Sequence, residues 1–479
     1  MTNLWCLLLA VSSLQAVDRA TVEAAAAQAV DYATQHLADY GGYLWWYRTD
    51  LQEQAGEGSP VPRGTIWVQP PGTPTVGEAL LRLAQVTGDQ RYLDAAVKAG
   101  EALAWGQLAS GGWFAYVQFD QPTLDALHYR HDWERDGKPS GKRRNTSTYD
   151  DDITQSALRF LLKLDRQLHA SNAAIHHAVG VGLAALVETQ HPNGGWTQVF
   201  TEAPDPSEPV LQASFPETWR ERPSGASYWF HFTLNDGVLQ QNVTTLYLAA
   251  DLLDSQRCRA AATKAGDFLL RAQLPAPQPV WAQQYDQQMH PAWARKFEPP
   301  AASSWETMMS LETLLEIWLR TGDAKYRQAM DPALAWLDQV RLKDGPWARF
   351  YELQTNRPLY LTSDYKLTYD DSDTPAHYGF KQDLAARLEQ VRNQLKLGRD
   401  KLVAQRAHTP TAPERQARLA ELEPRVAEAL ASLDAQGRWV TVQTSLKGKA
   451  LPQPREILDM QVLVDHLNLL AEYLELTRP

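Results

Sequence analysis

Cysteine is scarce in this sequence, because Cys6 and Cys258 are the only two among 479 residues. The apolar run Leu4–Val11 is too short to cross a bilayer. We interpret residues 1–16 as a signal peptide that ends at Ala16, and we expect a secreted or periplasmic protein with no membrane contact in its mature form. Cys6 would leave with this peptide, so the mature chain would form no intramolecular disulfide.

Positive charge is also in short supply. The chain has 46 Lys and Arg against 57 Asp and Glu, a formal net charge of −11. Proteins that bind nucleic acid need an excess of clustered basic residues, so nucleic acid is excluded as a partner. A polyanion would be repelled overall as well. Such a substrate therefore requires a local basic cleft, or divalent cations that bridge acidic protein groups to it.

Strand-like alternation is missing over any useful length, whereas helical periodicity recurs along the chain. Apolar residues make up 44% of the sequence, which is ample for a core. Gly-centred turns at Thr87–Asp89 and Thr321–Asp323 join consecutive helices. The predicted helices are Ala24–Leu37, Val76–Val86, Gln90–Leu108, Ile153–Gln167, His176–Thr189, Val238–Leu253, Ser255–Gln273, Ser304–Thr321 and Lys325–Val340.

Tryptophan marks an internal repeat. Five helical segments are each followed by a short polar turn and then by Trp113, Trp196, Trp281, Trp347 or Trp439, at separations of 83, 85, 66 and 92 residues. Each interval has room for two helices. Repeated hairpins bury their faces only against neighbouring hairpins, which predicts an all-α fold, an (α/α) toroid or an incomplete barrel. Closure would gather the turns at one end, where each Trp would face a sugar or serve packing alone.

The C-terminal part has a different composition. Residues 381–435 are rich in Leu, Ala and charged residues and are interrupted at His408–Pro413, which predicts a charged helical hairpin. A final helix is expected at Arg455–Leu476. We therefore divide the chain into a toroid at 17–380 and a helical extension at 381–479 that packs on it, and we expect a monomer.

Two acidic turns precede predicted helices. Asp150, Asp151 and Asp152 stand in succession, and Asn235–Asp236 opens a later helix. A single Asp would suffice as a helix cap. Three together indicate a hard cation such as Ca²⁺, which prefers carboxylate and carbonyl oxygens. Two carboxylate clusters at one end would equally suit the acid and base of a glycoside hydrolase.

Arginine accompanies aromatic residues at Arg295, Arg349 and Arg357. The guanidinium fork binds carboxylates, so these positions favour an anionic sugar over a neutral one. Structural ion pairs, Arg295 with Glu298 and Arg349 with Glu352, are the alternative.

Six motifs, in the order in which they occur, resemble the pectic acid lyase family, whose catalytic module is an (α/α) toroid. Together they cover about residues 75–380, and the ordered set is more specific than any single motif. They are Tyr149–Leu161, Pro192–Trp196, Phe232–Gly237, Trp281–Asp286, Ala294–Glu298 and Trp347–Pro358.

The resemblance implies a pectate lyase that cleaves polygalacturonate by calcium-assisted β-elimination. Arg295 would be the base that removes the C5 proton, which predicts a preference for alkaline conditions. Calcium would be held at Asp150, Asp151 and Asp236. Substrate would be bound by Arg349, Arg357, Lys366, Trp196 and Asn235.

The sequence departs from the family pattern in three places. Asp151 stands where the family has Asn, and Ser363–Asp364 stands where a second Arg is expected, with Lys366 as the nearest substitute. An insertion at about Thr201–Ser227 separates a Gly-Gly-Trp turn from the next helix. Two alternatives therefore stay open, a toroid glycoside hydrolase acting on uronic-acid polymers and a catalytically impaired pectate-binding protein.

Overall fold

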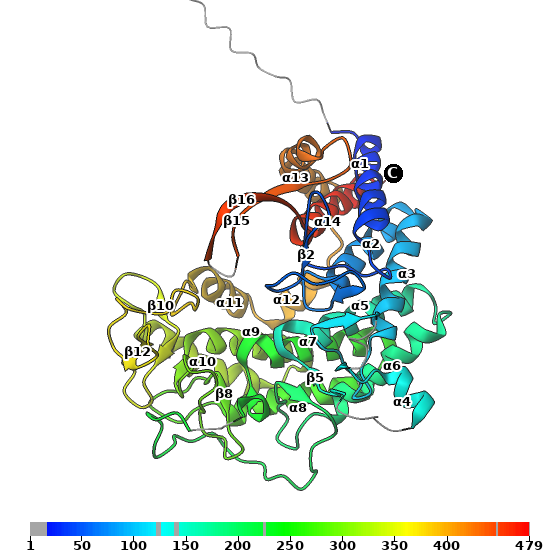
Figure 1. The fold of residues 1–479 in the computed structure, drawn as a ribbon. Coiled ribbons are helices and arrows are strands. Elements are labelled where there is room, and N and C mark those ends of the chain that lie inside the picture. The colour runs from blue at the N-terminus through cyan, green and yellow to red at the C-terminus, as the bar shows by residue number, and fades with distance from the viewer. Residues whose placement is uncertain (1–16, 121–125, 138–142, 224–226, 447–448, 479) are drawn as a thin grey trace, which may run out of the picture.

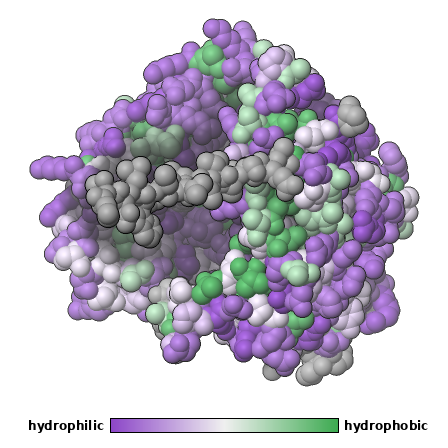
Figure 2. Space-filling view, turned by 90° about the horizontal axis from the view of Figure 1, so that it is seen from above, coloured by the Kyte–Doolittle hydropathy of each residue, from purple (hydrophilic) through white to green (hydrophobic). Residues whose placement is uncertain are grey.

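Helices that pair as hairpins dominate the computed structural model, which describes residues 17–120, 126–137, 143–223, 227–446 and 449–478 (Figure 1). The predicted signal peptide at 1–16 lies outside these ranges. None of the helices within them is both long and apolar enough to cross a bilayer. Hydrophilic side chains cover most of the face shown in Figure 2, in keeping with a core enclosed between the helices.

Four consecutive hairpins form two layers. Their first helices pack side by side as an inner layer, and their second helices pack on the outside. The all-α prediction of an (α/α) architecture is confirmed. The hairpins are α2 (Thr73–Thr87) with α3 (Gln90–Trp105), α5 (Ile153–Gln167) with α6 (Ala173–Glu188), α7 (Val238–Leu253) with α8 (Gln256–Ala272), and α9 (Ser304–Thr321) with α10 (Ala324–Gln339).

Helices from both ends of the chain extend this ring. Helix α14 (Met460–Leu476) packs against α2, α1 (Arg19–Tyr32) and α13 (Ala412–Ser432). On the opposite side, α11 (Ala385–Leu397) and α12 (Arg399–Arg406) pack against α9. One cluster of buried hydrophobic residues runs from Val22 to Leu474. The boundary at residue 380 stays a prediction, although both parts share this core.

The predicted Gly-centred turns have a clear local cause. Gly88 and Gly322 end α2 and α9 with φ of 74° and 72°, a conformation that favours glycine. Asp89 and Asp323 follow, and their side chains cap α3 and α10 by accepting from backbone N–H groups. The hairpins α2–α3 and α9–α10 therefore each reverse within two residues.

The five tryptophans of the repeat are structural. Trp113, Trp196, Trp281, Trp347 and Trp439 are all buried, and each indole N–H donates to a backbone carbonyl 10 or 12 residues earlier in the chain. Gln107, Gln190 and Gln273 form a second series, because each side chain donates both to its own turn and to the next outer helix. The glutamines of the repeat thus connect each hairpin to the next one by hydrogen bonds.

Short antiparallel strands occupy the loops between hairpins. Strands β5 and β7 lie just before the turns that lead into α5 and α7, and β9 runs directly into α9. The pairs are β3 (Thr65–Trp67) with β4 (Tyr116–Gln118), β5 (Ser147–Thr148) with β6 (Val199–Phe200), β7 (Phe232–Thr233) with β8 (Gln284–Tyr285), and β10 (Trp347–Ala348) with β14 (Lys381–Gln382). A four-stranded sheet has the order β13 (Leu367–Thr368), β12 (Pro358–Leu361), β11 (Phe350–Tyr351), β9 (Ala302–Ser303).

The C-terminal part differs from the sequence prediction. The final helix begins at Met460, because β16 (Lys449–Asp459) pairs with β15 (Val440–Leu446) and with β1 (Trp46–Arg48), which also pairs with β2 (Gln54–Ala55). The charged region forms three helices, since Gly398 interrupts the first of the two predicted. A four-stranded sheet therefore joins the two ends of the chain, which the prediction of a purely helical extension did not include.

Candidate active site

Three carboxylates meet where the turns before α5 and α7 approach each other. Asp150, Asp151 and Asp236 each offer an oxygen, and these oxygens lie within 4.8 Å of one another. The two turns are single 3₁₀ segments, Asp150–Asp152 and Asn235–Gly237. The sequence prediction placed both turns at one end of the toroid, and the structure brings them into contact.

Both turns carry backbone strain. Asp151, Asp152 and Asp236 have φ of 49°, 61° and 50°, in the left-handed region that non-glycine residues seldom adopt. Such strain persists where surrounding structure enforces it and is frequent at functional sites. Here it directs carboxylates from two hairpins toward one point.

The cluster is electrostatically unfavourable without a counter-charge. Burial, followed by the charges of Asp151 and Asp236, raises the pKa of Asp150 to about 8. Burial and Asp236 raise the pKa of Asp151 to about 6. Burial also raises the pKa of Asp236, against the opposing effect of Arg295. Asp151 and Asp236 are exposed to solvent, so the cluster is accessible to a ligand.

A hard cation fits this arrangement. Oδ1 of Asp150 is buried and has no hydrogen-bond partner, so a lone pair remains for a ligand. Asp151 is held by Gln69, whose side-chain N–H donates to Oδ2 at 2.9 Å. Asp152 is directed away, toward Arg159 at 2.5 Å. The donor set is thus three carboxylates, which suits Ca²⁺.

Arg295 faces the cluster from the loop after β8. Its Nε and Nη2 donate to the two carboxylate oxygens of Glu298 at 2.8 and 2.5 Å, so the alternative pairing considered for this arginine is present. Burial lowers the pKa of Arg295, but Glu298 and Asp236 outweigh this effect and raise the pKa above that of an ordinary arginine. The side chain is 40% exposed. Arg295 therefore combines a fixed orientation with access to a ligand.

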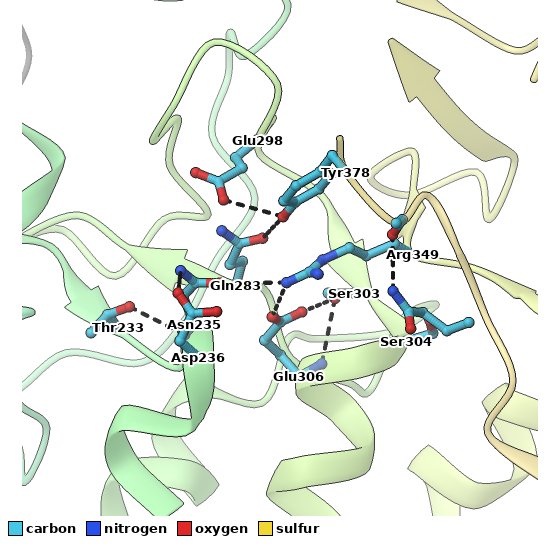
Figure 3. Close-up of polar contacts among 12 residues, drawn as sticks. Thr233, Asn235, Asp236, Gln283, Glu298, Ser303, Ser304, Glu306, Arg349 and Tyr378 are labelled. Carbon is cyan, nitrogen blue, oxygen red and sulfur yellow. Dashed lines mark hydrogen bonds and ion pairs between the residues drawn. The ribbon is translucent and has the colours of Figure 1, made fainter. Parts of the chain in front are cut away.

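A second arginine lies deeper. Arg349 donates to Glu306 at 2.9 Å and to the Asn235 side-chain oxygen at 3.4 Å (Figure 3). The alternative pairing of Arg349 with Glu352 is wrong, since Glu352 pairs with Arg220. Nε of Arg349 has no hydrogen-bond partner although it is buried.

Tyr378 links the two arginines. Its ring lies 4.7 Å from the Arg349 guanidinium and 5.9 Å from that of Arg295, measured to the ring centroid. Its hydroxyl lies 3.1 Å from Glu298 and 3.3 Å from the side-chain oxygen of Gln283 (Figure 3). The pKa of Tyr378 is raised by burial, so the phenol keeps its proton and donates.

The other predicted substrate contacts lie elsewhere. Trp196 is 1% exposed and its indole N–H is used within the core, so the structure corrects its assignment as a sugar contact. Arg357 stacks on Tyr369 at 3.3 Å from the ring centroid. Lys366 is 78% exposed and pairs with Asp364. Within the described part of the chain, neither side chain forms an ion pair or hydrogen bond with Asp150, Asp151 or Asp236.

Sequence reasoning missed Gln69, Glu306 and Tyr378. Gln69 follows β3, where Trp45 and Trp67 donate to its backbone and side-chain oxygens. Glu306 lies in the first turn of α9, where an acidic residue is an ordinary helix feature. Only the fold brings these side chains to the site.

Comparison with known proteins gives a partial match. Residues 123–346, a little under half of the chain, match the family described as pectic acid lyase. The predicted family resemblance is confirmed. This segment contains the three carboxylates and Arg295, whereas Gln69, Arg349 and Tyr378 fall outside it. No curated protein matches the sequence.

Among the solved structures that match is a family 10 polysaccharide lyase from Cellvibrio cellulosa, with 20% identity over 68% of this chain and 97% of that one, at a TM-score of 0.46. A mutant of the same enzyme in complex with trigalacturonic acid is 19% identical, over 68% and 98% of the two chains, at 0.46. The GH76 α-mannanase BT2949 of Bacteroides thetaiotaomicron has 9% identity over 96% of both chains, at 0.44.

Proposed function

We propose that this protein is a pectate lyase that cleaves polygalacturonate by calcium-assisted β-elimination. The observation that carries the proposal is the group of three carboxylates, within 4.8 Å of one another, beside the fixed guanidinium of Arg295. A cation site next to a cationic side chain suits an anionic polymer. A cation held by the three carboxylates would bind the substrate carboxylate, and Arg295 would act on the adjacent carbon, C5.

The residues have distinct roles in this proposal. Asp150, Asp151 and Asp236 would hold calcium, which when bound would draw charge from the substrate carboxylate and acidify the C5 proton. Arg295 would take that proton. Electrons from the C5–H bond form the C4–C5 double bond as the C4–O4 bond breaks, and the departing O4 gains a proton from solvent. Arg349 and Asn235 would supply positive charge and a polar contact to the substrate.

Arg295 must lose a proton before it can accept one. Glu298 holds its guanidinium in place but also raises its pKa, so the neutral form is rare at neutral pH. We therefore expect activity to increase toward alkaline pH. The orientation that Glu298 provides offsets part of this cost.

A glycoside hydrolase acting on uronic-acid polymers is the second candidate. It is favoured by the pKa of Asp150, raised to about 8, which is the behaviour of a general acid. In that reaction Asp150 would protonate the leaving oxygen, and Arg295 would not take part in proton transfer.

One experiment separates these functions. Polygalacturonate and Ca²⁺ are supplied to the unmodified protein and to Arg295→Ala. The ultraviolet absorbance of the unsaturated product, the reducing ends and the binding of pectate are measured. A lyase gives absorbance that chelator and Arg295→Ala both abolish. Reducing ends without absorbance would indicate hydrolysis. Binding of pectate with neither product would indicate an impaired binding protein. Secretion and a monomeric state belong to the same proposal.

A further inference from the structure

The segment just before β7 exposes large aromatic side chains. Trp229 is 48% exposed and Phe230 is 54% exposed, while Tyr228 beside them is partly buried. They form one 3₁₀ turn, Tyr228–Phe230, at the end of the insertion that separates this chain from the family pattern. Soluble proteins seldom expose adjacent large aromatics without a ligand or partner to cover them.

The backbone of this turn is fixed. The carbonyl of Trp229 accepts from the N–H of Gln198 at 3.1 Å, and that of Phe230 accepts from the Gln287 side chain at 3.0 Å. Tyr228 accepts from the N–H of His231 at 3.0 Å. The exposure of the rings is therefore a property of an anchored turn, so a ligand would meet them in place.

The same contacts place the turn beside the acidic cluster. Gln198, whose N–H donates to Trp229, also accepts from the N–H of Tyr149 at 2.9 Å, and Asp150 directly follows Tyr149 in the chain. Tyr228 lies within electrostatic reach of Arg295 and Asp150, since both affect its pKa. The turn that carries the exposed rings is thus joined by backbone hydrogen bonds to the segment that carries Asp150.

We propose that Tyr228, Trp229 and Phe230 form a saccharide-binding subsite that extends the site along a galacturonate polymer. This inference rests on the proposed function. One face of a pyranose ring carries C–H groups that pack on an aromatic face, whereas its carboxylate and hydroxyls remain in water. One galacturonate unit of the polymer would bind through its carboxylate at the calcium site. The exposed rings of Trp229 and Phe230 would then bind a further unit of the same polymer.

The test measures binding without turnover. Hexagalacturonate is titrated calorimetrically, with Ca²⁺ present, into Arg295→Ala and into the same variant carrying Trp229→Ala and Phe230→Ala. We expect the second protein to bind about 10-fold more weakly, which corresponds to about 1.4 kcal/mol. Trp133→Ala, which removes another tryptophan that is 42% exposed, is the matched control and leaves the affinity unchanged.

Three further measurements make the outcome decisive. In the Arg295→Ala background, Trp229→Tyr with Phe230 intact keeps both rings and should retain most of the affinity that the variant with both alanines loses. Equal affinity in all variants, or no hexagalacturonate binding by the parent, would overturn the subsite. Sedimentation that shows a dimer dependent on Trp229 would overturn it too, because the rings would then cover a second copy. Product absorbance from the unmodified protein decides the proposed function separately.

Discussion

The guanidinium of Arg349 donates to the carboxylate of Glu306 at 2.9 Å, and the two side chains are only 10% and 0% exposed. Burial raises the pKa of Glu306, while Arg349 and the hydroxyl of Ser303 lower it. The pair thus holds a positive charge near Asn235 inside the protein. Neither partner can lose its charge without consequence for the other.

Replacement of Glu306 by Gln should destabilise the fold by about 3 kcal/mol, because the buried guanidinium of Arg349 keeps its charge and loses its partner. Unfolding in urea, followed by circular dichroism, measures the loss. Asp251→Asn is the control, since Asp251 pairs with Arg320 at the surface and should contribute less than about 1 kcal/mol. Similar losses in the two variants would contradict the assigned importance of burial.

Calcium affinity should depend on Asp151. Asp151→Asn removes one of three negative ligands and should weaken Ca²⁺ binding about 10-fold, because affinity follows ligand charge. Asp152→Asn is a matched control, since Asp152 has the same left-handed backbone but faces Arg159. Calorimetry with Ca²⁺ alone gives both affinities. Equal weakening by the two changes would show that the ion is not held where we place it.

The pH dependence of turnover should respond to Glu298. Its carboxylate stabilises the protonated guanidinium and so raises the pKa of Arg295, and Glu298→Gln must lower that pKa. The alkaline rise of kcat should then move to lower pH by about 1 unit. Tyr378→Phe removes a hydrogen bond to Glu298 but leaves the negative charge of Glu298 in place, so it should shift the pH profile of kcat less. A profile that Glu298→Gln leaves in place would exclude Arg295 as the base.

Trp196 should matter for stability alone. Trp196→Phe deprives the carbonyl of Leu186 of its donor and leaves a small cavity, at a cost of about 2 kcal/mol. Trp113→Phe, the equivalent change one repeat earlier, should cost about the same. The KM for polygalacturonate is expected to be unchanged in both. A higher KM in Trp196→Phe with unaltered stability would restore this residue as a sugar contact.

The helical framework was predictable because its signals are local. Apolar periodicity and the sequence Thr-Gly-Asp locate α2, α3, α9 and α10, and Gly322 supplies the one backbone conformation that the turn requires. The meeting of Asp150 with Asp236 was also predictable, because equivalent turns of a closed repeat lie at one end. A regular repeat thus predicts which turns lie together even when they are far apart in the sequence.

Other features arise only from tertiary contacts. Gln69 and Tyr378 reach the site from loops far along the chain, and nothing in their sequence neighbourhood indicates a role. Strand β16 was hidden by Pro452 and Pro454, which argue against a strand. They are tolerated because β1 pairs only with Ile457–Asp459 and the register with β15 shifts between Ala450 and Arg455, so neither proline has a strand partner among the described residues.

The contact between α1 and α14 has a consequence for how this protein comes apart. Arg19 donates to the carbonyl of Leu474 at 2.6 Å, and the hydroxyl of Tyr473 donates to the carbonyl of Val17 at 2.6 Å. Loss of either terminal helix therefore also removes hydrogen bonds that hold the other. A circularly permuted chain, cut instead at the turn around Gly322, would carry this contact as an internal, covalent joint.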